Sequence, residues 1–472
     1  MTTTTPHYDV AIIGSGPAGI FAALELLKHS GTRVVIFEKG KDLPRRRCPI
    51  DDDHPSCINC APCDLVSGWG GAGAFSDGKI TLTTEFGGIL DQYLPKPELE
   101  TLIHQVDQTF VGYGGDRPVY GLDSEKVKEI IRKAATADLS LIPARIRHLG
   151  TERCYEILKN MREDLRDRVD LRFRSPVAEI LVDGERVTGV ETEDGKRIGA
   201  DYVISGPGRE GAEWFSGEAE RLNLGMSPNP VDIGVRVEVP AVILEHLTDV
   251  VYESKMIFYS KSFDDRVRTF CMNPYGEVVV ENTGGVLTVN GHSYAEKKTE
   301  NTNFALLVSK TFTEPFKEPL AYGKYVARLA NLIGGGVIVQ RLGDLLAGRR
   351  STQERIQRGL VRPTLRDATP GDLSLVLPYR HLVALLEMLE ALDSIAPGVH
   401  SRHTLLYGVE VKYYSARICL SPRLETGIEN LFAVGDGAGV TRGLAQAAVS
   451  GVVAGREIIS RLEKRAPSLG VS

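Results

Sequence analysis

The sequence predicts an α/β fold with a parallel sheet, and two glycine-rich segments at opposite ends of the 472-residue chain are the main reason. The first segment, GSGPAG at 14–19, follows the apolar run 8–13 and precedes a helix-patterned stretch at 20–27. A second apolar run, 34–37, then ends at Glu38. This succession of strand, glycine turn, helix and strand predicts a βαβ unit of a Rossmann-type, dinucleotide-binding domain.

Each glycine of this turn has a mechanical role in holding a dinucleotide. We expect Gly14 to allow the tight turn, Gly16 to let the backbone approach a pyrophosphate, and Gly19 to let helix and strand pack closely. The start of the helix would face the phosphates with its unpaired N–H groups. Glu38, 19 positions after Gly19, is placed to accept hydrogen bonds from an adenosine ribose. The cofactor contacts predicted from this unit are Gly14, Gly16, Pro17, Ala18, Gly19, Glu38 and Lys39.

The far end of the chain indicates which dinucleotide binds. An apolar run at 431–434 is followed by Gly435 and Asp436, and Gly443 opens a helix-patterned stretch that is rich in small residues. Here the sequence resembles the FAD-binding oxidoreductases of the glutathione-reductase-like type, in which such an aspartate binds the ribityl chain and the following helix points at the flavin pyrimidine. The resemblance implies FAD contacts at Gly435, Asp436, Gly443, Leu444 and Ala445.

The stretch 177–208 predicts a meander and a returning strand. Two Asp-Gly pairs, at 183–184 and 194–195, separate segments in which apolar and polar residues alternate. Such pairs between such segments are typical of β-hairpin turns. In the resembling proteins, this region is a three-stranded meander followed by the strand that returns under the nucleotide. The resemblance therefore implies cofactor contacts at Val177, Gly206 and Gly208, and we expect the rest of the meander to be ordinary surface.

The loop at 67–79 holds five glycines in thirteen residues. Glycine at this density is typical of a backbone that must approach another group closely. In flavoproteins of the resembling type, this segment wraps the flavin, which implies contacts at Gly70, Gly71, Ala72, Gly73 and Ser76. Lys79 would then be placed to tune the flavin charge, although it is equally compatible with a solvated loop residue.

Four of the seven cysteines cluster just before this loop, at Cys48, Cys57, Cys60 and Cys63. The last three have C-x2-C-x2-C spacing, which can place thiolates around an iron–sulfur cluster or a zinc ion, with Cys48 as the fourth ligand. The arginines at 45–47 would stabilise the thiolates. Two alternatives stay open: a group of reduced structural thiols, and a redox-active dithiol beside the flavin.

The composition is that of a soluble globular protein, with 42% hydrophobic and 25% charged residues. The formal net charge of −6 gives no reason to expect a nucleic-acid partner. No apolar run approaches the roughly 20 residues that span a bilayer, and the first residues lack the basic and apolar regions of a signal peptide. We therefore expect no membrane span and a cytoplasmic location.

As a whole, the chain resembles a family described as uncharacterised FAD-dependent dehydrogenases, with an architecture like that of geranylgeranyl reductases. The resembling motifs lie at 57–79, 232–238, 269–274, 289–294, 339–344 and 435–451. The resemblance implies an α/β fold in which a discontinuous FAD-binding domain carries an inserted α+β substrate domain. The expected boundaries are 1–85, 140–211 and 405–472 for the FAD-binding domain, 86–139 for a helical insertion and 212–404 for the substrate domain.

The reaction expected from this resemblance is hydride transfer between flavin N5 and a small organic substrate, forming or removing a C–C or C–N double bond. His292, Tyr294 and Lys79 are the candidate catalytic residues, because His292 and Tyr294 combine a general base with a phenol at the end of an expected strand. His292 is also compatible with a histidine that is only hydrogen-bonded within a loop. Tyr413 and Tyr414 are candidates either for facing the flavin or for filling the core. Gly334–Gly336 follows a helix pattern and not a strand, so no second dinucleotide site is expected.

Electrons would then be exchanged with a protein partner such as a ferredoxin, or with a transiently bound cofactor. One alternative is a ferredoxin-linked iron–sulfur flavoprotein. Another is a noncatalytic flavin and thiol redox sensor that uses the cysteines as its switch.

Overall fold

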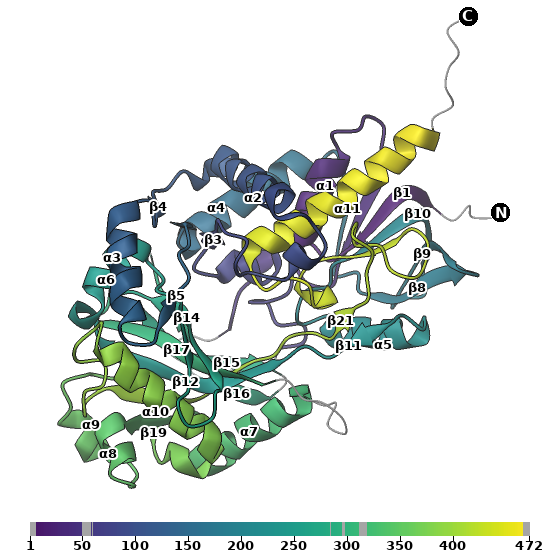
Figure 1. Cartoon of the computed structure of the whole chain (residues 1–472). Helices are drawn as coiled ribbons and strands as arrows, with labels where there is room; N and C mark the ends of the chain where they lie inside the picture. Colours follow the sequence, from purple (N-terminus) through teal and green to yellow (C-terminus); the bar gives the residue numbers. More distant parts are fainter. Residues whose placement is uncertain are drawn as a thin grey trace, which may run out of the picture. The chain divides into compact units, whose positions relative to one another are not determined.

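The structure is a computed structural model that describes residues 6–49, 58, 60–283, 285–294, 298–310 and 319–465. The chain forms two compact units (Figure 1). The first comprises 1–117, 151–229 and 414–472, and the second comprises 118–150 and 230–413. This division differs from the boundaries expected from the sequence, because the stretch 86–139 is shared between the units and the second long segment spans 230–413 and not 212–404.

The first unit is built on a mixed sheet in the order β7-β2-β1-β10-β9-β8, with β22 also paired to β10. The pairs β7–β2, β2–β1, β1–β10 and β10–β22 are parallel, whereas β8, β9 and β10 form the antiparallel meander. This arrangement confirms the Rossmann-type fold. The strands are β1 (His7–Ile13), β2 (Val34–Glu38), β7 (Asp170–Phe173), β8 (Val177–Asp183), β9 (Arg186–Thr192), β10 (Arg197–Ser205) and β22 (Leu431–Ala433).

Strand β1 is the point at which the strand order reverses, because β2 lies on one side of it and β10 on the other. The start of β10 pairs with β9, and its end pairs with β22 through Ser205 and Ala433. The carboxyl ends of β1, β10 and β22 therefore meet at one edge of the sheet. In open α/β sheets, ligands bind outside this edge, at the point of reversal.

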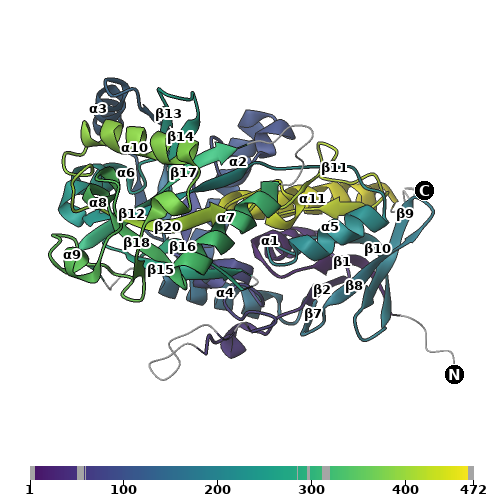
Figure 2. The ribbon, with the colours of Figure 1, turned by 90° about the horizontal axis from the view of Figure 1, so that it is seen from below.

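Helices α1 (Pro17–Leu26) and α11 (Leu444–Arg465) lie side by side in both ribbon views (Figures 1 and 2). Their backbones approach closely: a Cβ on Gly451 would stand 2.0 Å from the carbonyl oxygen of Ala18. Glycine is thus required at this crossing. The other long helices of the unit are α2 (Lys96–Phe110), α4 (Thr151–Leu165) and α5 (Ala212–Arg221).

The second unit is built on an eight-stranded sheet in the order β19-β18-β20-β12-β17-β14-β13-β5. Along strand β12, every second side chain is apolar and belongs to the core of this unit: Val231, Ile233, Val235, Val237 and Val239. Helix α10 (Tyr379–Asp393) packs against this core. The strands are β5 (Ser140–Leu141), β12 (Val231–Pro240), β13 (Met256–Tyr259), β14 (Arg266–Asn273), β17 (Asn301–Lys310), β18 (Ile338–Arg341), β19 (Thr369–Pro370) and β20 (Leu405–Lys412).

The other face of this sheet is polar, because the residues of β12 that alternate with the valines are Asp232, Gly234, Arg236 and Glu238. A hairpin of two strands, β15 and β16, packs against this face and shields it from solvent. The hairpin and the remaining helices of the unit are β15 (Glu277–Thr283), β16 (Val286–His292), α3 (Ser124–Ala135), α6 (Glu245–Val251), α7 (Pro319–Gly334), α8 (Leu342–Leu346) and α9 (Gln353–Gln357).

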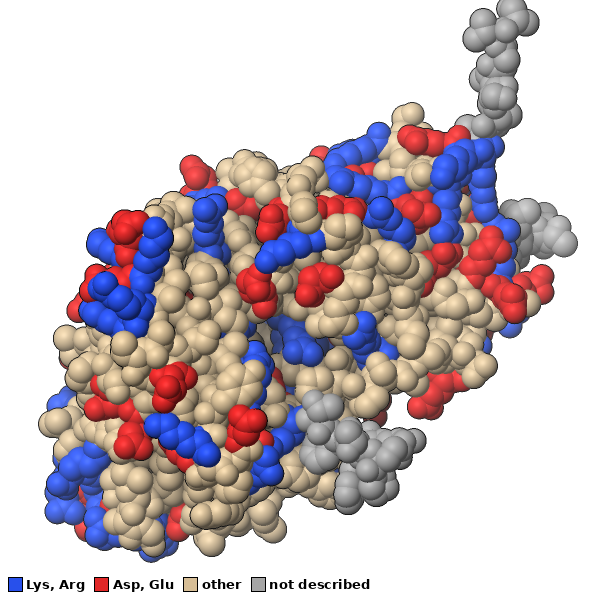
Figure 3. All heavy atoms as spheres, viewed as in Figure 1, with Lys and Arg blue, Asp and Glu red and all other residues tan. Residues whose placement is uncertain are grey.

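Acidic and basic side chains are interspersed over the face drawn in Figure 3, in keeping with a net charge of −6. Among the helices of the described residues, none is both long and apolar enough to cross a membrane.

Candidate functional site

Three glycines predicted to bind the cofactor follow the carboxyl ends of β1, β10 and β22. Gly14 has a φ of +95°, and a Cβ on it would stand 2.3 Å from the carbonyl oxygen of Gly206. Gly206 donates its N–H to Ile13 (2.8 Å), and the residue before Gly435 donates to Ser205 (2.9 Å). The loops that follow the three strands are therefore drawn together at the edge where a ligand is expected.

Two glycines of the fingerprint turn differ in their surroundings: Gly19 is closely packed, whereas Gly16 is open. A Cβ on Gly19 would stand 2.0 Å from the carbonyl oxygen of Gly14, so this position is required for packing. A Cβ on Gly16 would meet no atom within 4 Å. Helix α1 begins next to it, at Pro17, without a side-chain cap. An open backbone at the uncapped N-terminus of a helix fits the pyrophosphate of a dinucleotide.

The glycine-rich loop lies against this turn. A Cβ on Gly71 would stand 3.1 Å from the Cα of Gly16, and a Cβ on Gly73 would stand 2.9 Å from Cδ2 of Leu444. The loop therefore runs from the fingerprint turn to the start of α11. Three segments predicted separately as cofactor contacts thus meet in one place.

A fourth segment, at 86–88, was missed by the sequence analysis. Arg442 donates its N–H to the carbonyl of Gly87 (2.8 Å), and Gln446, which is 1% exposed, donates to the carbonyl of Phe86 (3.1 Å). A Cβ on Gly443 would stand 3.6 Å from the Cα of Gly87. The adjacent pair Gly87 and Gly88, both with positive φ, was the signal that could have extended the predicted site.

Asp436 lies in a short turn after β22 and accepts a hydrogen bond from the hydroxyl of Thr441 (2.7 Å). Burial raises the pKa of this carboxyl, against the opposing effect of Arg209, whose Nε lies 3.4 Å from Oδ2. Arg209 directly follows the predicted contact at Gly208. Sequence reasoning did not identify Arg209 or Thr441, because neither belongs to a recognisable motif.

Glu38, at the end of β2, is 6% exposed and bonds to four donors of the protein itself. Its Oε2 accepts from the N–H (3.0 Å) and the hydroxyl (2.7 Å) of Ser15, and its Oε1 accepts from the N–H groups of Gly40 (2.8 Å) and Gly68 (3.0 Å). Glu38 therefore ties the fingerprint turn to the glycine-rich loop. Its contact with a ribose stays a prediction, as do the contacts of Val177 and Lys39.

Two protein-family models match the chain, and their limits agree with its architecture. The model for pyridine nucleotide-disulphide oxidoreductases matches residues 8–56, which contain the fingerprint unit. The model described as "FAD-dependent protein, C-terminal domain-like" matches residues 230–413, which form the main part of the second unit. The chain is an FAD-dependent oxidoreductase.

A relative of this flavoprotein, an uncharacterized protein of Clostridium beijerinckii, is 27% identical over 477 residues, covering 96% of this chain and 81% of the relative. Glycine oxidase from Geobacillus kaustophilus aligns with a TM-score of 0.40 at 13% identity, covering 97% of this chain and 95% of that one. A geranylgeranyl bacteriochlorophyll reductase-like protein from Thermoplasma acidophilum aligns with a TM-score of 0.41 at 11% identity, covering 97% and 79%.

The predicted iron–sulfur or zinc site at the cysteines finds no support in the described part of the chain. Among the described residues, no group of three or more His, Cys, Asp or Glu residues is placed to hold a metal ion. Cys48, Cys60 and Cys63 are described as free thiols, whereas Cys57 lies outside the described residues. Arg46, one of the arginines expected to stabilise thiolates, donates to main-chain carbonyl groups. Cys63 is among the groups that interact electrostatically with Arg46, so the effect of Arg46 on the thiolates stays a prediction.

The three candidate catalytic residues lie in different units. Lys79, at the start of β3 (Lys79–Thr81) in the first unit, forms an ion pair with Asp77 (3.0 Å). His292 and Tyr294 lie at the end of β16 in the second unit, with their rings edge to face and their centroids 4.6 Å apart. Their catalytic roles stay predictions.

Ser293, between His292 and Tyr294, joins this pair to aromatic residues that the sequence analysis did not identify. Its hydroxyl lies 3.1 Å from the hydroxyl of Tyr252, whose ring stacks on His148 at 4.5 Å and contacts Tyr120 at 5.0 Å. These residues come from distant parts of the sequence, so no local pattern could have grouped them.

Tyr413 and Tyr414 are both largely buried. The sequence alone left open whether they face the flavin or fill the core. Tyr413 is in the second unit, packed against its apolar core, and burial raises the pKa of its phenol. The ring of Tyr414, in the first unit, is covered by the guanidinium of Arg442 at 3.8 Å from the centroid.

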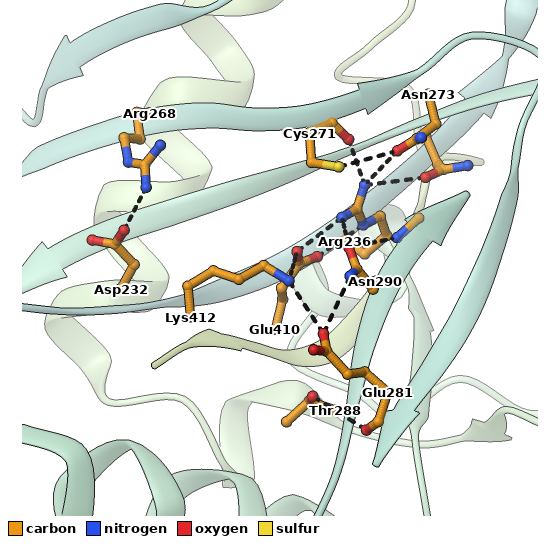
Figure 4. A network of polar contacts seen from close by, with 12 residues as sticks. Asp232, Arg236, Arg268, Cys271, Asn273, Glu281, Thr288, Asn290, Glu410 and Lys412 are labelled. Carbon is orange, nitrogen blue, oxygen red and sulfur yellow. Dashed lines mark hydrogen bonds and ion pairs between the residues drawn. The ribbon is translucent and has the colours of Figure 1, made fainter. Parts of the chain in front are cut away.

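A buried network of charges occupies the polar face of the sheet in the second unit (Figure 4). Arg236 bonds to Glu410, which lies 3.1 Å from Nζ of Lys412. Desolvation lowers the pKa of Lys412, but Glu410 and Glu281 outweigh it and the net shift is upward. Asn290 on β16 accepts from Arg236 (3.1 Å) and donates to Glu281 (3.2 Å). The network thereby fastens the hairpin, and with it His292, to the sheet.

Proposed function

We propose that this flavoprotein transfers a hydride between FAD and a small organic substrate, forming or removing a C–C or C–N double bond. The observation that carries the FAD assignment is the open backbone at Gly16 beside the uncapped start of α1, at the edge where Gly14, Gly206 and Gly435 converge. FAD, when bound, accepts or supplies the hydride. The protein contributes binding, orientation and proton transfer.

The residues of the first unit divide the binding task by their chemistry. Gly16 and the N-terminus of α1 are assigned to the pyrophosphate, which needs N–H donors and close backbone approach. Asp436 is assigned to the ribityl hydroxyls, because a carboxylate accepts from them. The loop from Gly70 to Ser76 and the start of α11 at Leu444 are assigned to the ring system.

The substrate is assigned to the second unit, beside His292 and Tyr294. We propose that His292 takes or gives the proton that accompanies the hydride, and that Tyr294 orients its ring through their edge-to-face contact. The aromatic residues Tyr252 and Tyr120 would supply an apolar wall for a small organic molecule. Electrons would pass to or from a ferredoxin-like protein or a transiently bound cofactor.

The first experiment identifies the cofactor and the class of substrate. We expect the purified protein to release FAD, and not FMN, on denaturation. The oxidised enzyme is then mixed anaerobically with secondary amines and amino acids, and the photoreduced enzyme with imines and α,β-unsaturated carbonyl compounds, while the absorbance of the flavin is followed.

We expect one of these classes to change the redox state of the flavin, and His292→Gln to slow that step at least tenfold because a positioned proton donor or acceptor is lost. Tyr325→Phe, on the exposed face of α7, is the matched control. Absence of bound flavin would refute the whole assignment. Bound FAD that reacts with neither class would refute the proposed reaction but not the cofactor site.

A further inference from the structure

Arg46 is a buried cation whose hydrogen bonds all end on the main chain. It is 3% exposed, and its guanidinium donates to the carbonyl oxygens of Asp64 (2.8 Å), Leu65 (3.0 Å), Trp69 (2.5 Å) and Gly71 (2.9 Å). Burial lowers its pKa to about 10, although the neighbouring Glu38 and Asp64 act in the opposite direction. A charge held at this cost of desolvation needs a full set of acceptors.

The four acceptors belong to the glycine-rich loop and to the two residues that lead toward it. This loop has an unusual backbone: Gly68, Gly70 and Gly71 have φ values of +113°, +85° and +57°. Three left-handed positions within four residues keep the segment 68–71, which leads into the 3-10 helix Gly71–Phe75, from joining a regular helix or strand that would satisfy all of its carbonyl groups. Arg46 supplies the missing donors from one side.

The opposite side of the loop is fixed to the fingerprint turn. Gly70 donates its N–H to the carbonyl of Ser15 (2.8 Å), and Gly68 donates to Oε1 of Glu38 (3.0 Å). The loop is thus held between a cation that binds its carbonyls and acceptors that bind its amides. This double attachment leaves Gly71 beside Gly16, where the pyrophosphate is assigned.

The ring of Phe75, at the end of the same loop, covers the guanidinium with its centroid 4.9 Å from Cζ of Arg46. A planar guanidinium can stack on a ring and still bond in its own plane to several carbonyl groups. A lysine carries its three donors on a single nitrogen, so it cannot reproduce the four bonds that Arg46 makes from three separate nitrogens.

We propose that Arg46 is a positioning residue of the flavin site, which holds the loop at 67–76 in the conformation that receives FAD without touching FAD itself. The inference rests on the assignment of this loop to FAD. It is separate from the thiolate-stabilising role that the neighbouring cysteines suggested for Arg46, and it explains why a buried arginine lies in this part of the chain.

The test measures the dissociation constant of FAD from the apoprotein by quenching of flavin fluorescence, for wild type, Arg46→Lys and Arg46→Ala. Each lost hydrogen bond to a charged group weakens the loop substantially, so we expect Kd to rise at least tenfold in both variants. Adding millimolar guanidinium or methylguanidinium ion is expected to restore affinity in Arg46→Ala alone. Rescue of this kind would not follow from a general loss of packing.

Arg221→Lys is the matched control, because Arg221 also donates to a main-chain carbonyl, that of Ile180 (2.7 Å), on another element of the same unit. We expect this variant to bind FAD as wild type does. A folded Arg46→Ala variant with the wild-type Kd would overturn the inference, and wild type that binds no FAD would overturn the proposed function instead.

Should both Arg46 variants fail to fold, amide hydrogen exchange in the wild-type protein tests the premise that the loop is already held before FAD binds. We expect the N–H groups of Gly68 and Gly70 to be protected in the apoprotein already, because the loop is held by protein contacts, and to gain protection when FAD is added. Rapid exchange at both positions in the apoprotein would show that the loop is not held before FAD binds, which would overturn the inference.

Discussion

Arg236 and Glu410 form a doubly hydrogen-bonded ion pair in which both side chains are completely buried. Nε of Arg236 lies 2.8 Å from Oε2 of Glu410, and Nη2 lies 2.8 Å from Oε1. The remaining donors of the guanidinium reach the carbonyl of Cys271 (2.8 Å) and the side chain of Asn290 (3.1 Å), among others. Because the acceptors lie on four different strands, this single side chain joins β12 to β14, β16, β17 and β20.

Replacing Arg236 with methionine is expected to lower the free energy of unfolding by about 3–5 kcal/mol, because it removes the doubly bonded partner of the buried Glu410 carboxylate and leaves only Lys412 beside it. Denaturant titration followed by circular dichroism measures the change. Lys128→Met is the control, since Lys128 pairs with Glu125 on the exposed surface of α3, where an ion pair contributes little.

The double variant Arg236→Met, Glu410→Gln separates the loss of the pair from the cost of an unpaired charge. We expect it to be more stable than Arg236→Met alone, because a neutral amide costs less to bury than a carboxylate that keeps only Lys412 as its partner, and Lys412 still pairs with Glu281. If the double variant were the less stable of the two, the packing of the arginine stem, and not the charge of Glu410, would account for the effect.

The glycine at position 16 provides a test of the cofactor site that is independent of stability. Both Gly16 and Gly217 have a backbone that accepts alanine, and a Cβ at either position would meet no protein atom within 4 Å. We therefore expect neither Gly16→Ala nor Gly217→Ala to be less stable than wild type, and Gly217→Ala, inside α5, to be slightly more stable. Only Gly16→Ala is expected to weaken FAD binding, by tenfold or more, because its methyl group would occupy the place of the pyrophosphate. Equal affinities would place the phosphates elsewhere.

The sequence predicted the parts of the fold whose signals are local. The turn around Gly14, the acid at Glu38 and the segment after Gly435 each carry a short pattern with one mechanical meaning, and the structure brings the corresponding elements together. The segment at 86–88 was missed because its two glycines acquire meaning only through their contact with Arg442 and Gln446, more than three hundred positions away.

The role of Arg46 could not be predicted either, because its neighbours in the sequence suggested a different role from the one that its neighbours in space indicate. Its neighbours in the sequence are cysteines, which suggested an electrostatic partner, whereas its neighbours in space are carbonyl groups of a loop that begins some twenty positions later. Local sequence patterns also could not predict the partners of Arg236 on the polar face of the sheet. Alternation along β12 indicates that one face is polar, but only the pairing of β12 with β20 identifies Glu410 as the partner.

The cysteines of the first unit are expected to differ strongly in reactivity. Cys419 is exposed, whereas Cys154 on α4 is 5% exposed and burial raises its pKa to about 12, with further repulsion from Asp77 and Glu152. At pH 8, iodoacetamide should therefore modify Cys419 quickly and leave Cys154 unmodified in the folded protein. Peptide mass spectrometry measures both sites, and the variant Cys419→Ser identifies the fast phase.

Modification of Cys154 at the rate of Cys419 would show that α4 opens to solvent on the time scale of the reaction. Because Leu158 on the same helix accepts a hydrogen bond from the indole of Trp69 (2.8 Å), such opening would also release the glycine-rich loop. Protection of Cys154 by added FAD would then connect the helix to the cofactor.

His381, on α10, is expected to make the protein less stable as the pH falls from 6.5 toward 4. Its side chain is 3% exposed, and burial lowers its pKa to about 4, with repulsion from Lys310 and Arg380 adding to the shift and Asp265 opposing it. Between these pH values the unfolded chain binds a proton that the native protein does not, so the free energy of unfolding falls with pH. At pH 5 the loss is about 2 kcal/mol.

The variant His381→Leu lacks this titration, so its stability is expected to change less than that of wild type between pH 7 and pH 5, and the stability difference between the two proteins should shift by about 2 kcal/mol in favour of the variant. Urea titrations at the two pH values measure this shift. His104→Gln, on the exposed face of α2, is the control for the loss of a histidine as such. A constant difference between wild type and His381→Leu would mean that His381 takes up its proton in the native protein as readily as in the unfolded chain, and that α10 yields enough to hydrate it.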